Sequence, residues 1–187
     1  MNQHQITRFG IISALREEQQ GLVQAMDGAA TLMHGMRDYT VGRLWGIDAV
    51  CVLSRIGKVA ASMTATMLVE KFGVTHILFT GVAGSGDTGV RIGDIVIAES
   101  LIQHDMDASP LFPRYQVPLI GLAHFDSDVT LSRRLARAAD RFIDIDFLSV
   151  IGVDEQRAFQ LGQPKVHRGL IASGDQFVSS RAHSERL

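Results

Sequence analysis

Short, nearly continuous apolar runs recur along the chain, and segments of helical pattern separate several of them. The first run, from Phe9 to Leu15, is partly β-branched and is typical of a central strand buried on both faces. Further strands are predicted over 39–44, 47–53, 75–80, 94–98 and 166–172, with a turn at Trp45-Gly46. Strands that alternate with helices form an α/β sheet that carries helices on both faces.

Three segments are predicted to be helices. The first begins in the charged run Arg16 to Gln20, carries Leu22, Val23 and Met26 at helical spacing, and ends at Asp27-Gly28. The other two cover 58–72, which is rich in Ala and Met, and 126–142.

The composition is that of a globular protein, with 46% hydrophobic residues and a formal net charge of −2 in 187 residues. We therefore expect one domain over 1–187 in the cytoplasm, and neither nucleic acid nor a membrane surface as partner. No apolar run approaches the roughly 18 residues of a membrane span, and the first residues lack a signal-peptide pattern. Cys51, the single cysteine, excludes an intramolecular disulfide and is predicted to be a small core residue.

Two acidic residues stand directly after the first predicted strand. Ligands of α/β sheets bind beyond the carboxyl ends of the strands, so Glu17 and Glu18 are expected at that edge. A partly desolvated carboxylate there can act as a general base on water. The alternative is an acidic first turn that complements a helix dipole.

The run Gly81 to Gly86 follows another predicted strand. Its glycines would let backbone groups approach a ligand closely, although a tight turn is the alternative. Its order, G-x-x-G-x-G, differs from the dinucleotide fingerprint, so a Rossmann cofactor is not supported. The run His104-Asp105-Met106-Asp107 matches no established metal spacing, and we expect a solvated loop or the rim of a ligand site.

Taken together, these motifs resemble the 5′-methylthioadenosine/S-adenosylhomocysteine nucleosidases of the purine nucleoside phosphorylase superfamily. The resemblance covers essentially the whole chain, and the matching motifs occur in the family's order and spacing. They are Gly10 to Glu18, Ser54 to Ala61, Thr80 to Gly84, Gly93 to Val96, and Ser173 to Phe177.

The resemblance implies hydrolysis of an adenine N-glycosidic bond, without metal or cofactor, by a homodimer in methionine salvage. The implied fold is a single nucleoside phosphorylase-like domain, with three αβα layers around a mixed β-sheet. By position, Glu18 matches the glutamate that activates the attacking water. Leu15 and Ile56 match apolar wall positions of the nucleoside pocket.

The remaining implied site residues surround the sugar and the base. Val82, Ala83 and Gly84 match the loop that faces them, although many members carry Ser where this chain has Val82. Phe177 matches an aromatic residue that packs on adenine, and Val178 matches the residue whose backbone meets the purine edge.

The chain departs from the family pattern near its last residue, Leu187. The family's V-E-M-E-like ribose motif and the Ser-Asp motif whose aspartate protonates the purine do not appear. We therefore expect the C-terminal part of the domain to be missing and this 187-residue chain to be a poor catalyst. Three alternatives stay open: another purine nucleosidase such as a futalosine hydrolase, a phosphorylase, or an inactive nucleoside-binding or dimerisation remnant. A phosphorylase is disfavoured because 77–80 contain no arginine to hold phosphate.

Overall fold

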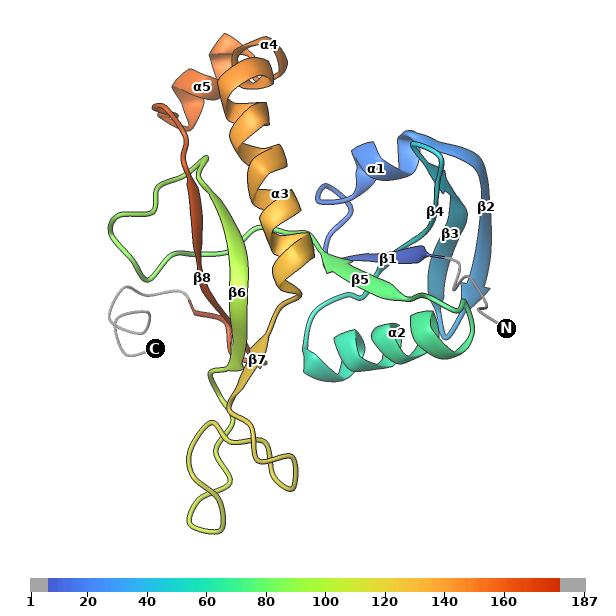
Figure 1. The fold of residues 1–187 in the computed structure, drawn as a ribbon, viewed down its shortest axis with the longest axis vertical. Coiled ribbons are helices and arrows are strands. Elements are labelled where there is room, and N and C mark those ends of the chain that lie inside the picture. The colour runs from blue at the N-terminus through green and yellow to red at the C-terminus, as the bar shows by residue number, and fades with distance from the viewer. Residues whose placement is uncertain (1–6, 179–187) are drawn as a thin grey trace. The chain divides into compact units, whose positions relative to one another are not determined.

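The computed structural model describes residues 7–178, and the chain divides into two compact units, Met1–Ala83 and Gly84–Leu187 (Figure 1). Each unit is described by itself. The first contains β1 (Arg8–Ser13), α1 (Gln20–Gln24), β2 (Met26–His34), β3 (Arg37–Leu44), β4 (Ile47–Leu53), α2 (Lys58–Glu70) and β5 (His76–Phe79).

These five strands form one mixed sheet in the order β2-β3-β4-β1-β5. Strand β1 lies between β4 and β5 and is parallel to both, whereas β2, β3 and β4 form an antiparallel meander. The turn between β3 and β4 has positive φ at both Trp45 (50°) and Gly46 (81°), as expected of a two-residue hairpin.

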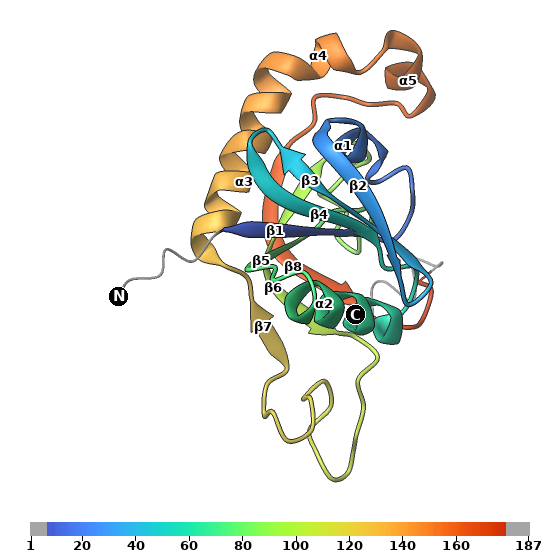
Figure 2. The same ribbon diagram turned by 90° about the vertical axis from the view of Figure 1, so that its right-hand side faces the viewer.

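The core of this unit lies on the two faces of its sheet. On one face Ile12, Tyr39 and Val50 pack in a cluster with Leu68 of α2, and Tyr39 stacks on Phe72. On the other face Ile11 and Cys51 pack in a cluster that Leu22 and Val23 of α1 cover. Helices α1 and α2 therefore lie on opposite faces of the sheet, which gives three layers (Figure 2).

The second unit contains a three-stranded sheet and most of the helical residues. Its elements are β6 (Ile95–Gln103), β7 (His124–Asp126), α3 (Val129–Arg141), η1 (Phe142–Asp146), α4 (Phe147–Val150), α5 (Val153–Ala158) and β8 (Val166–Ser173). Strand β6 lies between β7, to which it is antiparallel, and β8, to which it is parallel. Helix α3 packs along β6, and the Asp128 carboxylate caps it by accepting the Leu131 N–H at 2.8 Å (Figure 1).

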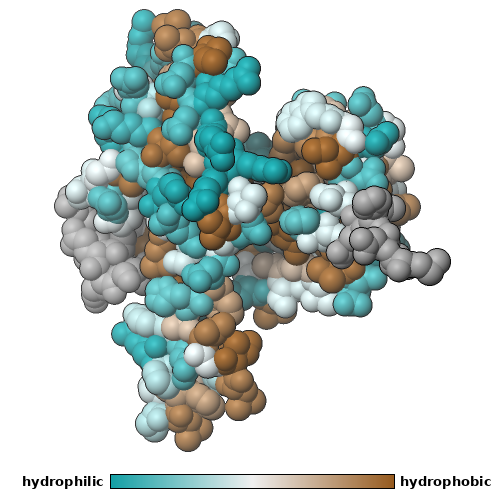
Figure 3. Space-filling model, in the orientation of Figure 1, coloured by the Kyte–Doolittle hydropathy of each residue, from teal (hydrophilic) through white to brown (hydrophobic). Residues whose placement is uncertain are grey.

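The loop between β6 and β7 carries apolar side chains on its surface. Leu111, Leu119 and Ile120 have exposed fractions of 84%, 94% and 60%. Figure 3 shows brown, hydrophobic side chains gathered at the end of this loop.

The α/β class, with mixed sheets, is confirmed, and the single domain over 1–187 stays a prediction. The strand predicted over 47–53 is β4 itself. The first predicted helix is wrong at both ends: 16–19 form a turn, and Met26 begins β2. The structure also contains β2, β7, η1, α4 and α5, for which the sequence indicated no elements. Within 7–178, no helix is long and apolar enough to cross a membrane.

Candidate functional site

Glu18 lies in the turn between β1 and α1, and its carboxylate is held by backbone donors. Oε2 accepts the N–H groups of Ala14 at 2.9 Å and Leu15 at 2.8 Å. Oε1 accepts the N–H of Val82 at 3.0 Å, from the loop that follows β5. Three N–H donors fix the orientation of the carboxylate at the carboxyl edge of the sheet. The residue that the sequence singled out as a base therefore occupies the expected edge, but in a turn and not in a helix.

Gly81 lets the loop after β5 approach this carboxylate. A Cβ at position 81 would lie 2.9 Å from Oε1 of Glu18 and 3.3 Å from the ring of Phe79. The first distance is shorter than real Cβ contacts, so a side chain here would push the carboxylate or the loop away. Glycine at position 81 therefore accommodates the Glu18–Val82 contact without a shift of the carboxylate or the loop.

The side chain of Gln19 anchors the same turn to the sheet, and this role was not predicted from the sequence. Its side chain is buried, with a residue exposure of 4%. Nε2 donates to the carbonyl oxygens of Ile11 at 2.9 Å and Val52 at 3.4 Å, and so ties the turn to β1 and β4. A polar residue inside a predicted helix gives no local signal of this role, because the two carbonyls come from strands.

The two predicted apolar wall residues, Leu15 and Ile56, and the predicted loop residue Val82 follow three neighbouring parallel strands. Leu15 follows β1, Ile56 follows β4 and Val82 follows β5, so all three lie at the carboxyl edge where Glu18 lies. Their exposed fractions are 46%, 81% and 83%. Exposed apolar side chains at the same edge as a fixed carboxylate can take up an apolar ligand surface. The wall role of Leu15 and Ile56, and the ligand-facing role of Val82, stay predictions.

The other predicted site residues lie at the end of the first unit and in the second. Ala83 ends the first unit and Gly84 begins the second. Phe177 and Val178 follow β8, where the Phe177 ring is 90% exposed and Val178 is half-buried. Their contacts with a base stay predictions.

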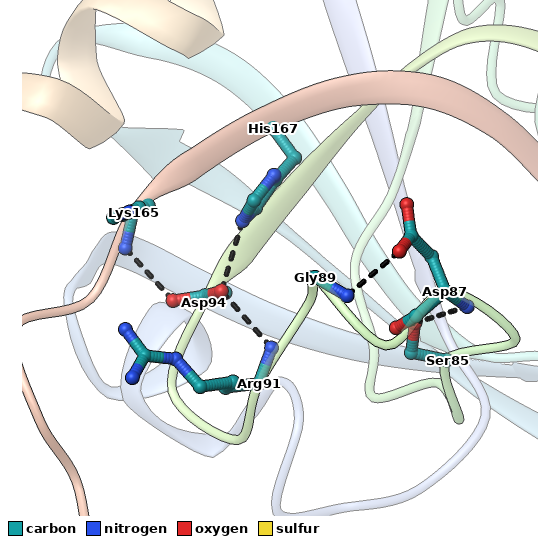
Figure 4. Close-up of polar contacts among 7 residues, drawn as sticks. All are labelled: Ser85, Asp87, Gly89, Arg91, Asp94, Lys165 and His167. Atoms are coloured by element: carbon teal, nitrogen blue, oxygen red, sulfur yellow. Dashed lines mark hydrogen bonds and ion pairs between the residues drawn. The ribbon is translucent and has the colours of Figure 1, made fainter.

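The loop that begins at Gly84 continues into a turn over 85–89 that its own hydrogen bonds close (Figure 4). The Ser85 hydroxyl donates to the Asp87 carbonyl at 2.8 Å and accepts the Asp87 N–H at 3.0 Å. The Asp87 carboxylate accepts the Gly89 N–H at 2.7 Å. These hydrogen bonds lie within 85–89 and order the loop next to Gly84.

Asp94, at the start of β6, is a second carboxylate held by backbone donors (Figure 4). It accepts the N–H groups of Arg91 at 3.0 Å and Lys165 at 2.9 Å, and it pairs with Nε2 of His167 at 2.8 Å. The Arg91 N–H is the main cause of a pKa lowered to about 2, and the hydrogen bonds from His167 and Lys165 act in the same direction. Its side chain is only 2% exposed, and its bonds to Lys165 and His167 join the start of β6 to β8 and the residue before it.

The predicted core role of Cys51 is confirmed, since it is buried in β4 and burial raises the pKa of its thiol to about 11. An inert thiol of this kind takes no part in nucleophilic chemistry. Within the described part of the chain, no group of three His, Cys, Asp or Glu side chains could hold a metal ion.

Comparisons with known proteins agree with the resemblance. The sequence model of the family described as the phosphorylase superfamily matches residues 8–187. The 5′-methylthioadenosine/S-adenosylhomocysteine nucleosidase of Shewanella frigidimarina is 34% identical over 174 residues, which are 91% of this chain and 66% of that protein. The chain therefore spans slightly less than two thirds of this relative's length.

Solved structures show the same fold. The Streptococcus pneumoniae MTA/SAH nucleosidase in complex with 8-aminoadenine matches with a TM-score of 0.76 and 31% identity, over 96% of this chain and 69% of that one. The futalosine hydrolase of Helicobacter pylori matches with a TM-score of 0.76 and 28% identity, over 98% of this chain and 70% of that one.

Proposed function

The chain belongs to the phosphorylase superfamily, and from this premise we propose that it hydrolyses the N-glycosidic bond of 5′-methylthioadenosine or S-adenosylhomocysteine and releases adenine. The observation that carries the proposal is the carboxylate of Glu18, fixed by three backbone N–H groups at the carboxyl edge of β1, β4 and β5. This is the edge of an α/β sheet at which ligands bind.

The proposed reaction follows from the position of this carboxylate. Water attacks the anomeric carbon of the ribose as the bond to the purine breaks, and the bonding electron pair leaves with the purine, which takes up a proton from the solvent. Glu18 accepts the proton that the water loses, and its negative charge stabilises the positive charge that develops on the sugar. Because the backbone donors hold the carboxylate in place beforehand, no reorganisation is needed during the reaction.

The proposed substrate contacts are apolar walls, a loop that faces the ribose and the base, and residues that hold the adenine. Leu15 and Ile56 pack against the nucleoside as apolar walls, and the exposed loop of Val82, Ala83 and Gly84 faces the ribose and the base. Phe177 stacks on adenine, which its 90% exposed ring leaves it free to do. The backbone of Val178 reads the purine edge.

The test is release of adenine from the two nucleosides by the purified protein, followed by chromatography. A rate that is unchanged by added phosphate, with free sugar as the second product, identifies hydrolysis. Strict dependence on phosphate would identify a phosphorylase and contradict the proposal.

A second candidate substrate is futalosine, because the structural match to the Helicobacter pylori futalosine hydrolase has the same TM-score of 0.76 as the nucleosidase match. The sequence identity of 28% is lower than the 31% of that nucleosidase, which is why futalosine is second. Comparison of kcat/KM for base release from futalosine and from 5′-methylthioadenosine separates the two.

The proposal extends to assembly, compartment and pathway. A homodimer would bury the exposed Leu111 and Leu119 of the β6–β7 loop, and light scattering measures it. A cytoplasmic location fits a chain whose one cysteine, Cys51, is a buried free thiol, and cell fractionation tests it. A role in methionine salvage follows from the methylthio group of the proposed substrate, and growth of a deletion strain on 5′-methylthioadenosine as sulfur source tests it.

A further inference from the structure

The segment after β8, which carries Phe177 and Val178, is anchored to the turn after β6 within the second unit. The His104 N–H donates to the Ser173 carbonyl at 3.0 Å, where the β6–β8 pairing ends. One residue later, the Asp105 carboxylate accepts the N–H of Asp175 at 2.7 Å. A side chain thus continues the β6–β8 connection after the strands have ended.

Gly174 lies against the same two side chains. A Cβ at position 174 would lie 2.5 Å from Nε2 of His104 and 2.8 Å from Cγ of Asp105. His104 is itself buried, with 7% exposure, so it has little space into which to move. The backbone at 174–175 therefore rests directly on the His104–Asp105 pair.

The consequence for Phe177 is geometric. Its ring is 90% exposed, so packing within the described chain does little to fix its position. What orients the segment two residues earlier is the hydrogen bond to Asp105 and the close approach at Gly174. A ring that stacks on a flat ligand must be held at the correct angle before the ligand binds, or ordering it lowers the affinity.

We propose that Asp105, supported by His104, is a positioning residue for the purine, which it orients through the segment 174–178. The inference rests on the proposed function, since it assigns a task to a motif that the proposed reaction leaves unused. Asp105 acts through the Asp175 amide and Phe177 and touches no reacting atom. Its loss weakens binding of the base and leaves the cleavage step nearly unchanged.

The test compares Asp105→Ala with Asp105→Asn, which keeps an acceptor oxygen, and with Asp107→Ala as a matched control. Asp107 stands two residues away, and its carboxylate bonds to the N–H and hydroxyl of Ser109. We expect Asp105→Ala to raise KM and the adenine dissociation constant about tenfold with kcat changed less than threefold, as for loss of a hydrogen bond to a charged acceptor. Asp105→Asn recovers most of the affinity, and Asp107→Ala matches the unmodified protein.

Two further measurements separate positioning from a merely structural role. Hydrogen exchange at 174–178 should become faster in Asp105→Ala and should slow again on addition of adenine. Gly174→Ala disturbs the same contact from the backbone side, so it should raise KM as well, even if Asp105→Ala folds poorly.

The outcomes are distinguishable. If the unmodified protein neither binds nor releases adenine, the proposed function fails and the inference falls with it. If the unmodified protein does both, and the variants that fold keep its KM and adenine affinity, the inference alone is overturned. Equal losses in kcat and in melting temperature, without a change in KM, would make Asp105 a structural residue only.

Discussion

Glu18 in the first unit and Asp94 in the second are bound in nearly the same way. Each carboxylate accepts backbone N–H groups from its own turn and from a segment distant in the sequence. They differ in what remains available. Asp94 pairs with His167 and has a side-chain exposure of 2%, whereas Glu18 is half-buried beside the exposed Val82.

The comparison shows that backbone donors alone do not make a carboxylate functional. Donors hold the group in place in both regions, but only a carboxylate that can still meet water or substrate can act as a base. The hydrogen bonds that Asp94 can accept are used in the connection between β6 and β8, so Asp94 contributes to stability. Glu18 is expected to contribute to chemistry, and the predictions below test this division.

The largest effect is expected for Glu18→Gln. The amide cannot take a proton from water, and its NH₂ group faces backbone N–H donors on one side. We expect kcat for adenine release to fall about 10²–10⁴-fold, as for loss of a general base, with a far-ultraviolet spectrum unchanged. Glu17→Gln, at the exposed neighbouring position, is the control and should keep its activity. A Glu18→Gln variant within a few-fold of the unmodified protein would exclude the proposed base.

Asp94→Ala should show the opposite profile, with a loss of stability and little effect on chemistry per folded molecule. Two backbone N–H groups and His167 lose their acceptor inside the structure. We expect the free energy of unfolding in urea to fall by about 2–4 kcal/mol. Asp87→Ala is the control, because its exposed carboxylate bonds to the single N–H of Gly89, and it should cost less than about 1 kcal/mol.

The lowered pKa of Asp94 predicts that the free energy of unfolding depends on pH in the acidic range. The pKa of Asp94 is about 2 in the folded protein and has an ordinary value of 3.8. A lowered pKa means that the contribution is complete above about pH 4 and is lost as the pH falls towards 2. The difference in unfolding free energy between the unmodified protein and Asp94→Asn should therefore shrink over this range. A difference that stays constant would show that the carboxylate charge is not what stabilises the connection.

An element of the fold could be predicted from the sequence where its own residues, and not distant ones, cause it to form. Strand β4 could be predicted to the residue because its centre, Ala49–Val52, is apolar and buried on both faces. Strand β2 could not, because seven of its nine residues are exposed and its pairing to β3 is interrupted by a bulge after Asp27. Such an edge strand forms because it pairs with the neighbouring strand, and its own hydrophobic pattern does not indicate it.

The candidate site shows the same limit. The position of Glu18 after a buried strand indicated the edge at which it lies. Its donor from Val82 is 64 residues away, and the first helix is shortened because the Glu18 carboxylate bonds to the N–H groups of Ala14 and Leu15 instead of starting a helical turn. Neither the close approach at Gly81 nor the anchoring by Gln19 could be predicted from the sequence, since both depend on strands brought together by folding.

Gly81→Ala tests whether the position of the Glu18 carboxylate matters as well as its charge. The added Cβ would lie 2.9 Å from Oε1, so the carboxylate or the loop must shift by several tenths of an ångström. We expect kcat to fall about tenfold with a small change in unfolding free energy, because catalytic geometry is less tolerant than folding. An unchanged kcat would show that the turn adapts, and that the rigidity assigned to the Glu18 region is not needed.

The smallest effect is expected for Gly21→Ala in α1, the helix that follows the Glu18 turn. A Cβ there meets nothing within 4 Å, and alanine is favoured over glycine inside a helix, so the unfolding free energy should rise by about 0.5–1 kcal/mol. If the Glu18 turn is as rigid in the working protein as the Asp94 connection, kcat and KM stay the same. A more stable variant with a lower kcat would instead show that the turn must move during the reaction, and that only Asp94 is a fixed point of the fold. Urea unfolding and steady-state kinetics on the same preparation decide between these results.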